Sequence, residues 1–194
     1  AKVVAITDIS GTINDPQGLD LDVLTELFDK QLPINAYPPE KLHPGGFLLD
    51  RDSVRDSDDF SQETLIYRRD EKGLGKSYLS SNEMHFLFRN NVHRTPADIF
   101  IPAGGRPRTL SDENVEDFLL EDGTPSSKAI VEGANLYLTP EAREKLQSMG
   151  VLIFKDSSAN KGGVMSSSME VLYGLLLEEK EFLDNKPKLL YEIS

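Results

Sequence analysis

The sequence has no cysteine, no long apolar run and a shortage of positive charge. Without cysteine the chain can form no disulfide, no thiolate nucleophile and no cysteine-ligated metal site. No apolar run approaches the roughly 20 residues that a membrane-spanning helix needs. Lys and Arg number 21 against 33 Asp and Glu, a net charge of −12, which argues against nucleic-acid and anionic-membrane partners. We therefore expect a protein of the reducing cytoplasm.

Recognisable metal and phosphate motifs are also missing. The three histidines have no zinc-ligand spacing. The acidic run Asp50–Asp59 lacks the central glycine and the terminal glutamate of a calcium loop. Gly73–Ser77 imitates the end of a phosphate-binding loop, but Asp70 stands where the leading glycine is required. We expect no metal site.

What is present is most orderly between Ala129 and Val171. Ala129–Val131 and Val151–Phe154 are apolar runs of strand length. Between them Thr139 can cap a helix, and a proline follows it at the first helical position. Gly150 suits the left-handed stop of that helix. A strand, a helix and a strand in this order predict two parallel strands with helices covering them.

Polar residues and glycines follow each of these predicted strands. Asn135 comes after the first strand, and Asn160 with Gly162 and Gly163 comes after the second. In parallel α/β sheets, ligands bind at the carboxyl ends of the strands. The sequence therefore predicts a binding site at this edge.

The rest of the chain predicts a sheet of about four strands, with Val3–Ile6 and Asp98–Ile101 as the other two. Further helices are expected to begin at Asp20 and Ser80, over residues 111–119 and from Gly163 to about Leu183. The segment 33–79 shows no stable apolar period and dense charge, so we expect a flexible insertion in a single domain there. The tail 186–194 is expected to leave the domain.

Several segments resemble the nucleotide-binding domain of glutamate dehydrogenases. The resemblance covers roughly Val3–Leu21 and Ala97–Leu177. The segment Ile99–Pro107 looks most like the large NAD-specific subclass. The other segments that support it are Glu132–Asn135, Thr139–Ala142 and Ala159–Val164.

The resemblance implies a partial Rossmann-like fold and a role in the oxidative deamination of L-glutamate to 2-oxoglutarate and ammonia with NAD. It also implies a homo-oligomer as the full-length protein. By resemblance, Asp8 holds the adenosine ribose, Ala103 and Gly104 line the dinucleotide, Asn135 and Asn160 position the nicotinamide half, and Ser167 meets the substrate carboxylate.

Parts of the family pattern are absent from the sequence. The first strand of the domain, its Gly-x-Gly-x-x-Gly turn and the catalytic lysine and aspartate have no counterpart in this chain. The chain also starts inside a predicted strand. We therefore expect a fragment that has no catalytic residue and no activity by itself.

Two other functions remain open. The chain could belong to a leucine, valine or phenylalanine dehydrogenase with the same domain, or to a nucleotide-sensing or interaction module that lost the chemistry. Individual residues also have simpler interpretations: Asp8 as a turn or cap residue, and Ser167 as a small helix-packing residue.

Overall fold

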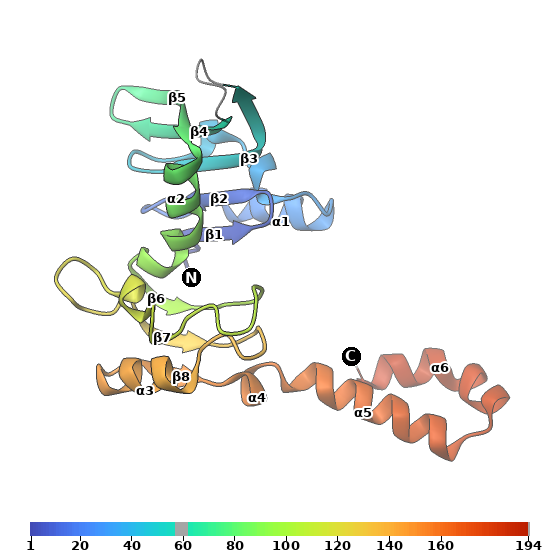
Figure 1. Cartoon of the computed structure of the whole chain (residues 1–194). Helices are drawn as coiled ribbons and strands as arrows, with labels where there is room; N and C mark the ends of the chain where they lie inside the picture. Colours follow the sequence, from blue (N-terminus) through green and yellow to red (C-terminus); the bar gives the residue numbers. More distant parts are fainter. Residues whose placement is uncertain (57–61, 194) are drawn as a thin grey trace.

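The chain forms two β-sheets linked in sequence by helix α2 (Ser81–Arg94), as the computed structural model shows (Figure 1). The structure describes residues 1–56 and 62–193, so two acidic residues of the calcium pattern, Asp58 and Asp59, lie outside the described residues. One sheet is antiparallel, in the order β1 (Ala5–Asp8), β2 (Gly11–Asn14), β3 (Phe47–Asp56), β4 (Gln62–Asp70) and β5 (Gly73–Ser80). The other is parallel, in the order β6 (Ala97–Phe100), β7 (Ser127–Val131) and β8 (Leu152–Phe154).

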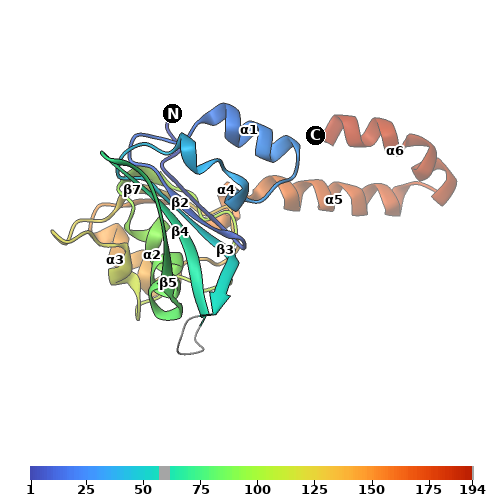
Figure 2. The same ribbon diagram turned by 90° about the horizontal axis from the view of Figure 1, so that it is seen from above.

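Both faces of the antiparallel sheet are covered. Successive side chains of a strand point to opposite faces, and Leu48 and Leu49 accordingly enter two different cores. Leu48 packs in the core that contains Leu27 of helix α1 (Leu21–Asp29). Leu49 packs with Leu79 in the core that α2 covers. Figure 2 shows α1 and α2 on opposite sides of this sheet.

Three predicted helix starts are confirmed. Asp20 accepts hydrogen bonds from two N–H groups in the first turn of α1. Ser80 and Glu83 form a reciprocal capping box at the start of α2. Thr139 caps helix α3 (Pro140–Ser148), which begins with the proline at its first position. These starts depend on side chains within three residues, which explains why the sequence reveals them.

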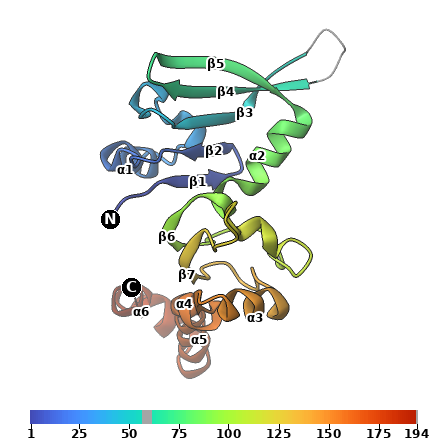
Figure 3. The ribbon, with the colours of Figure 1, turned by 90° about the vertical axis from the view of Figure 1, so that its left-hand side faces the viewer.

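The prediction for the first strand named the wrong sheet. Residues 5–8 form β1, which pairs antiparallel with β2 rather than joining the parallel sheet. A two-residue turn joins the strands, and a Cβ on Gly11 would lie only 2.1 Å from the Leu49 carbonyl oxygen, so only glycine fits there. Two short β-branched runs separated by two residues form a hairpin. Figures 1 and 3 show β1 as the strand of this sheet nearest to β6.

The segment 33–79, expected as a flexible insertion, contains regular structure. Its described residues form two 3₁₀-helices, η1 (Ile34–Ala36) and η2 (Pro39–Lys41), and strands β3, β4 and β5. Buried side chains at widely spaced positions anchor it, including Tyr37, Leu48 and Ile66. The dense charge lies on strand positions that face solvent, so composition alone suggested disorder. The flexibility of the segment stays a prediction.

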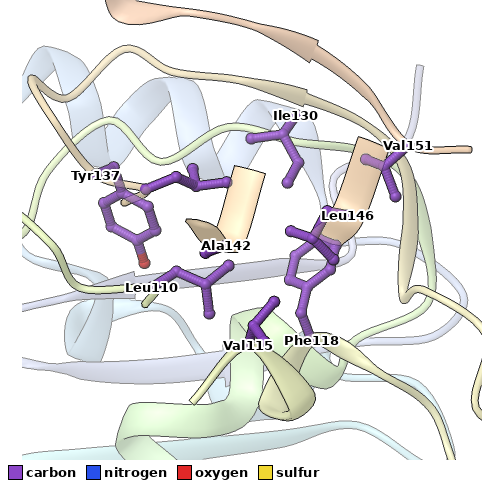
Figure 4. Packing of buried hydrophobic residues seen from close by; sticks show 9 residues of the cluster. Leu110, Val115, Phe118, Ile130, Tyr137, Ala142, Leu146 and Val151 are labelled. Atoms are coloured by element: carbon purple, nitrogen blue, oxygen red, sulfur yellow. The ribbon is translucent and has the colours of Figure 1, made fainter. Parts of the chain in front are cut away.

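The three parallel strands are confirmed close to their predicted positions. Their core lies between the sheet, α3 and the 3₁₀-helix η3 (Val115–Phe118), which forms where an α-helix over 111–119 was expected. Figure 4 shows this core with Ile130 of β7 and Leu146 of α3 inside it. The opposite face of the sheet is bare: Ile99, Leu152 and Phe154 are 54–66% exposed.

The last part of the chain forms a helical hairpin away from the sheets. After the short α4 (Asp156–Ala159), α5 (Lys161–Leu176) and α6 (Glu179–Ile193) replace the predicted single helix to Leu183. In Figures 1 and 2 this hairpin projects from the body, and α5 contains no buried residue. The expectation that helices cover the strands therefore fails for α5. No helix of the described residues is long and apolar enough to cross a membrane.

Candidate functional site

The parallel strands end at one edge of their sheet, and the loops after β6 and β7 are tied together there. Parallel pairing places the three carboxyl ends at the same edge. The Ala134 N–H donates to the Pro102 carbonyl at 2.7 Å, and the Arg108 N–H donates to the Leu136 carbonyl at 2.7 Å. The two loops therefore form one hydrogen-bonded surface.

A buried ion pair anchors the loop after β7. Glu132 is fully buried and accepts hydrogen bonds from the Leu138 N–H at 3.1 Å and from Arg143 Nη2 at 3.1 Å. The carboxylate thus joins the first and last parts of the loop 133–138 and ties both to α3. Charge-assisted bonds of this kind are stronger than neutral ones, so they hold the loop firmly.

A second buried contact attaches the same loop to α2. The Tyr137 hydroxyl and His93 Nε2 lie 2.7 Å apart. Burial lowers the pKa of His93 to about 4 and raises the pKa of Tyr137. Both groups are therefore neutral at pH 7, and their hydrogen bond fixes the loop without placing a charge in the core.

Two asparagines meet at the exposed end of this loop. Asn160 Nδ2 donates to Asn135 Oδ1 and, at 3.2 Å, to the Gly133 carbonyl. Asn135 Nδ2 and Asn160 Oδ1 make no hydrogen bond to any residue in the described ranges. The pair therefore presents one donor and one acceptor to a ligand.

Asp156, the first residue of α4, supports the Asn135–Asn160 pair. The Leu136 N–H donates to Asp156 Oδ2 at 2.9 Å, and this bond is the main reason why the pKa of Asp156 lies below its usual value. The contact joins the loop after β7 to the loop after β8. All three strand-end loops are thereby connected.

Ala103 and Gly104 lie at the same edge. A Cβ built on Gly133 would be 3.4 Å from the Ala103 Cα and from the Pro102 oxygen, so the loops after β6 and β7 are in close contact there. A Cβ on Gly104 would meet nothing within 4 Å, which leaves its backbone open to a ligand. The structure thus brings together four of the six predicted site residues.

Ser167 makes no hydrogen bond to this group in the described part of the chain. It lies in the second turn of α5, where its hydroxyl donates to the Val164 carbonyl at 3.1 Å. That bond satisfies the hydroxyl within its own helix. Ser167 is exposed, which does not fit the interpretation as a helix-packing residue. The substrate role stays a prediction.

Asp8 lies in the antiparallel sheet and closes the β1–β2 turn. Its Oδ1 accepts from the N–H of Ser10 at 2.8 Å and of Gly11 at 3.2 Å, and its Oδ2 accepts from the Ile34 N–H at 2.8 Å. These contacts fit the interpretation of Asp8 as a turn residue. The ribose role stays a prediction.

Sequence reasoning missed the groups that hold the site in place. The histidines were considered only for zinc-ligand spacing, and Arg143 was not considered. His93 and Tyr137 are 44 residues apart, so no local pattern could join them. Within residues 1–56 and 62–193, no three His, Asp or Glu side chains gather where they could hold a metal ion.

Comparisons with known proteins identify relatives of this chain. A sequence model described as Glutamate/Leucine/Phenylalanine/Valine dehydrogenase matches residues 1–185. Glutamate dehydrogenase 2 of Dictyostelium discoideum is 39% identical over 184 residues, which are 93% of this chain and 16% of that protein. A probable NAD-specific glutamate dehydrogenase of Schizosaccharomyces pombe is 38% identical over 185 residues, 95% of this chain and 15% of that protein.

The chain thus spans about one sixth of the length of these curated relatives. Among solved structures, a chain of Plasmodium falciparum glutamate dehydrogenase 2 aligns with 98% of this chain and 33% of its own length. The TM-score is 0.47 and the identity 19%, which does not by itself establish a common fold.

Proposed function

Because the chain belongs to the family of glutamate, leucine, phenylalanine and valine dehydrogenases, we propose that it is the NAD-binding domain of a glutamate dehydrogenase. The names of the relatives support glutamate over the other amino acids. In this proposal β6, β7 and β8 are part of a Rossmann-like sheet. The first strand of that sheet and its phosphate-binding turn are absent from these 194 residues.

The Asn135–Asn160 pair is the observation that supports this proposal most directly. The carboxamide of nicotinamide presents one oxygen acceptor and one NH₂ donor. The unused Asn135 Nδ2 and Asn160 Oδ1 supply the complementary donor and acceptor. Burial of Glu132 and Tyr137 fixes the loop behind the pair, so the two amides are preorganised before the cofactor arrives.

The other predicted residues complete the proposed site. Ala103 and Gly104 line the dinucleotide with backbone and no bulky side chain. Asp8 accepts hydrogen bonds from the hydroxyl groups of the adenosine ribose. Ser167 contacts the substrate carboxylate. NAD, when bound, supplies the hydride acceptor. The residues of this chain bind and orient it, while proton transfer requires an acid or base that the sequence does not contain in the family's motif.

The whole enzyme is proposed to convert L-glutamate and NAD to 2-oxoglutarate and ammonia, as a cytoplasmic homo-oligomer. We expect this chain alone to have no dehydrogenase activity. A glutamate-dependent rise in NADH absorbance with the purified chain, above a heat-inactivated control, would show that expectation to be wrong. A longer protein containing the chain should form NADH with L-glutamate and much less with L-leucine, L-valine or L-phenylalanine.

Titration of the chain with NAD, followed by NMR, tests the proposed site. Asn135→Ala and Asn160→Ala should each weaken NAD binding about five- to tenfold, since a net hydrogen bond contributes about 1 kcal/mol. Asn185→Ala on α6 removes the same side chain far along the sequence and serves as the control. Absence of saturable NAD binding, or equal NAD affinity in all variants, would contradict the proposal that this site binds NAD.

A further inference from the structure

The edge that holds the two asparagines is positively charged, although the chain is strongly acidic. The loops over residues 101–110, 133–138 and 155–161 contain four cationic side chains and one carboxylate, a local net charge of +3 in a chain of −12. The carboxylate is Asp156, which already accepts from two backbone N–H groups. The cations are Arg106, Arg108, Lys155 and Lys161. A local concentration of cations in an acidic chain attracts anionic ligands.

Two of these cations lie on a backbone that is unusually well fixed. The loop after β6 is tied to the loop after β7 by hydrogen bonds to the Leu136 and Tyr137 carbonyls. Gly105 has a φ of 112°, and a Cβ there would lie 3.1 Å from the Tyr137 ring. The Arg106 carbonyl accepts a hydrogen bond from the Thr109 hydroxyl, which fixes the backbone at Arg106. The chain on both sides of Arg106 is therefore preorganised.

Arg108 has a strained backbone. Its φ is 61°, in the left-handed region that non-glycine residues rarely adopt, and it donates its N–H to Leu136, whose φ is 54°. Besides these two, only Gln31 among the described non-glycine residues has a positive φ. Such strain persists where surrounding contacts enforce it, and it concentrates at ligand sites.

Neither guanidinium group has a partner in the described part of the chain. Arg106 and Arg108 are exposed, and no hydrogen bond or ion pair joins their side chains to a described residue. Other arginines differ: Arg94 pairs with Asp117, and Arg143 pairs with Glu132. Two unused guanidinium groups on a fixed loop are suited to bind an anion with two terminal oxygens in a forked geometry.

We propose that Arg106 and Arg108 bind the phosphate or carboxylate oxygens of a ligand at the carboxyl edge of the parallel sheet. The proposal extends the proposed function, because the anion is either the pyrophosphate of the dinucleotide or a carboxylate of a dicarboxylic substrate. A phosphate and a carboxylate each present two terminal oxygens that a guanidinium group can bind through paired hydrogen bonds. The loop over 101–110 would then bind the anionic group of the ligand, whereas the asparagine pair binds a neutral amide.

Two separate titrations of the 194-residue chain distinguish the two sources. Inorganic pyrophosphate stands for the phosphate source and glutarate for the dicarboxylic source. The readout is the amide NMR shifts of Gly104, Gly105, Arg106 and Arg108. At least one anion should shift these amides saturably. Pyrophosphate binding assigns the edge to the cofactor, and glutarate binding assigns it to the substrate.

Removing either guanidinium should weaken binding of that anion about tenfold or more, as expected for a charge-assisted hydrogen bond. Arg106→Gln and Arg108→Asn are suitable, because asparagine tolerates the left-handed backbone at position 108. Arg108→Lys keeps a charge and should restore part of the affinity. Circular dichroism spectra check that each variant is folded.

Lys128→Gln is the matched control. It removes one charge from β7 near the amino end of the strand, where Lys128 pairs with Asp98 on the surface. The affinity of Lys128→Gln for the anion should differ from that of the wild type by less than twofold. The proposal is wrong if neither anion binds saturably, or if Lys128→Gln weakens binding as much as the arginine variants.

The NAD titration separates this proposal from the proposed function. Arginine-dependent binding of pyrophosphate or glutarate without any NAD binding would support the anion site and contradict the NAD function. NAD binding with unchanged affinity in both arginine variants, together with no binding of either small anion, would contradict only the anion site.

Discussion

The polar side chains at strand ends have different partners in the two sheets. In the antiparallel sheet, Asp8 and Asp70 close tight turns by accepting N–H groups two or three residues ahead. In the parallel sheet, Glu132 reaches Arg143 on the next helix, and Asn135 meets Asn160 from the following loop. Hairpin turns use their polar groups locally, whereas parallel strands bring loops from different parts of the chain to one edge.

This difference explains where ligand-binding groups remain available. Asp8 and Asp70 each use Oδ1 to accept two N–H groups of their own turn. The loops of the parallel edge satisfy each other and leave the outer amide groups of Asn135 and Asn160 unused. The predictions that follow test this contrast, from the largest expected effect to the smallest.

Glu132→Ala should have the largest effect. It leaves the Arg143 charge buried without its partner and the Leu138 N–H without an acceptor, so we expect a loss of about 3–5 kcal/mol in the free energy of unfolding. Chemical denaturation measures this loss. Glu116→Ala removes the 80% exposed partner of Lys145 and should change stability by less than about 1 kcal/mol. Similar losses in both variants would contradict the anchoring role of Glu132.

His93 should make the fold sensitive to acid. Its pKa falls from 6.5 in the unfolded chain to about 4 in the fold because of burial, so the unfolded state binds a proton more readily. Stability should therefore be complete above pH 6.5 and decrease by about 3 kcal/mol as the pH falls to 4.

The comparison with His93→Gln isolates this effect, because glutamine does not titrate. The difference in unfolding free energy between wild type and His93→Gln should decrease between pH 6.5 and 4. His85→Gln, which removes the imidazole of an exposed histidine on the same helix, serves as the control substitution. A pH-independent difference for His93→Gln would show that the histidine is not held neutral.

Asp8→Ser tests both interpretations of one carboxylate. Loss of the bonds to Gly11 and Ile34 should lower stability by about 1–3 kcal/mol. If the carboxylate also holds the ribose, the ratio of NAD to NADP affinity falls as well, because Asp8 no longer repels a 2′-phosphate. Asp70→Ser removes a similar turn residue and should lower stability without changing that ratio. An unchanged ratio in folded Asp8→Ser would leave only the turn role.

The smallest expected effect compares amide exchange in two segments. Amides of β4 that pair with β3 and β5 should exchange slowly, because Leu65 and Ile66 are buried and bonded on both sides. Amides of α5 should exchange faster, because none of its residues is buried. Hydrogen exchange followed by mass spectrometry gives both rates. Faster exchange in β4 than in α5 would restore the interpretation of 33–79 as a flexible insertion.

Local signals predicted a large part of the parallel region. Thr139 and Gly150 marked the ends of α3, and apolar runs marked β7 and β8 within two residues. The same signals placed Asn135 and Asn160 at strand ends. They failed for β1, because a strand of four residues has the same pattern in either sheet.

By itself, the sequence determined three helix starts, the strand positions of the parallel sheet and the placement of Asn135 and Asn160 at one edge, since caps, turns and apolar periodicity act over a few residues. Ala103 and Gly104 were expected to line the site only from the family resemblance. Only the tertiary structure decided that Tyr137 meets His93 and that the segment 33–79 completes a second sheet. These outcomes depend on contacts between residues far apart in the chain, whereas β1 and β2 form a local hairpin that the prediction missed. Their stability comes from burial and packing, which no short stretch of sequence specifies.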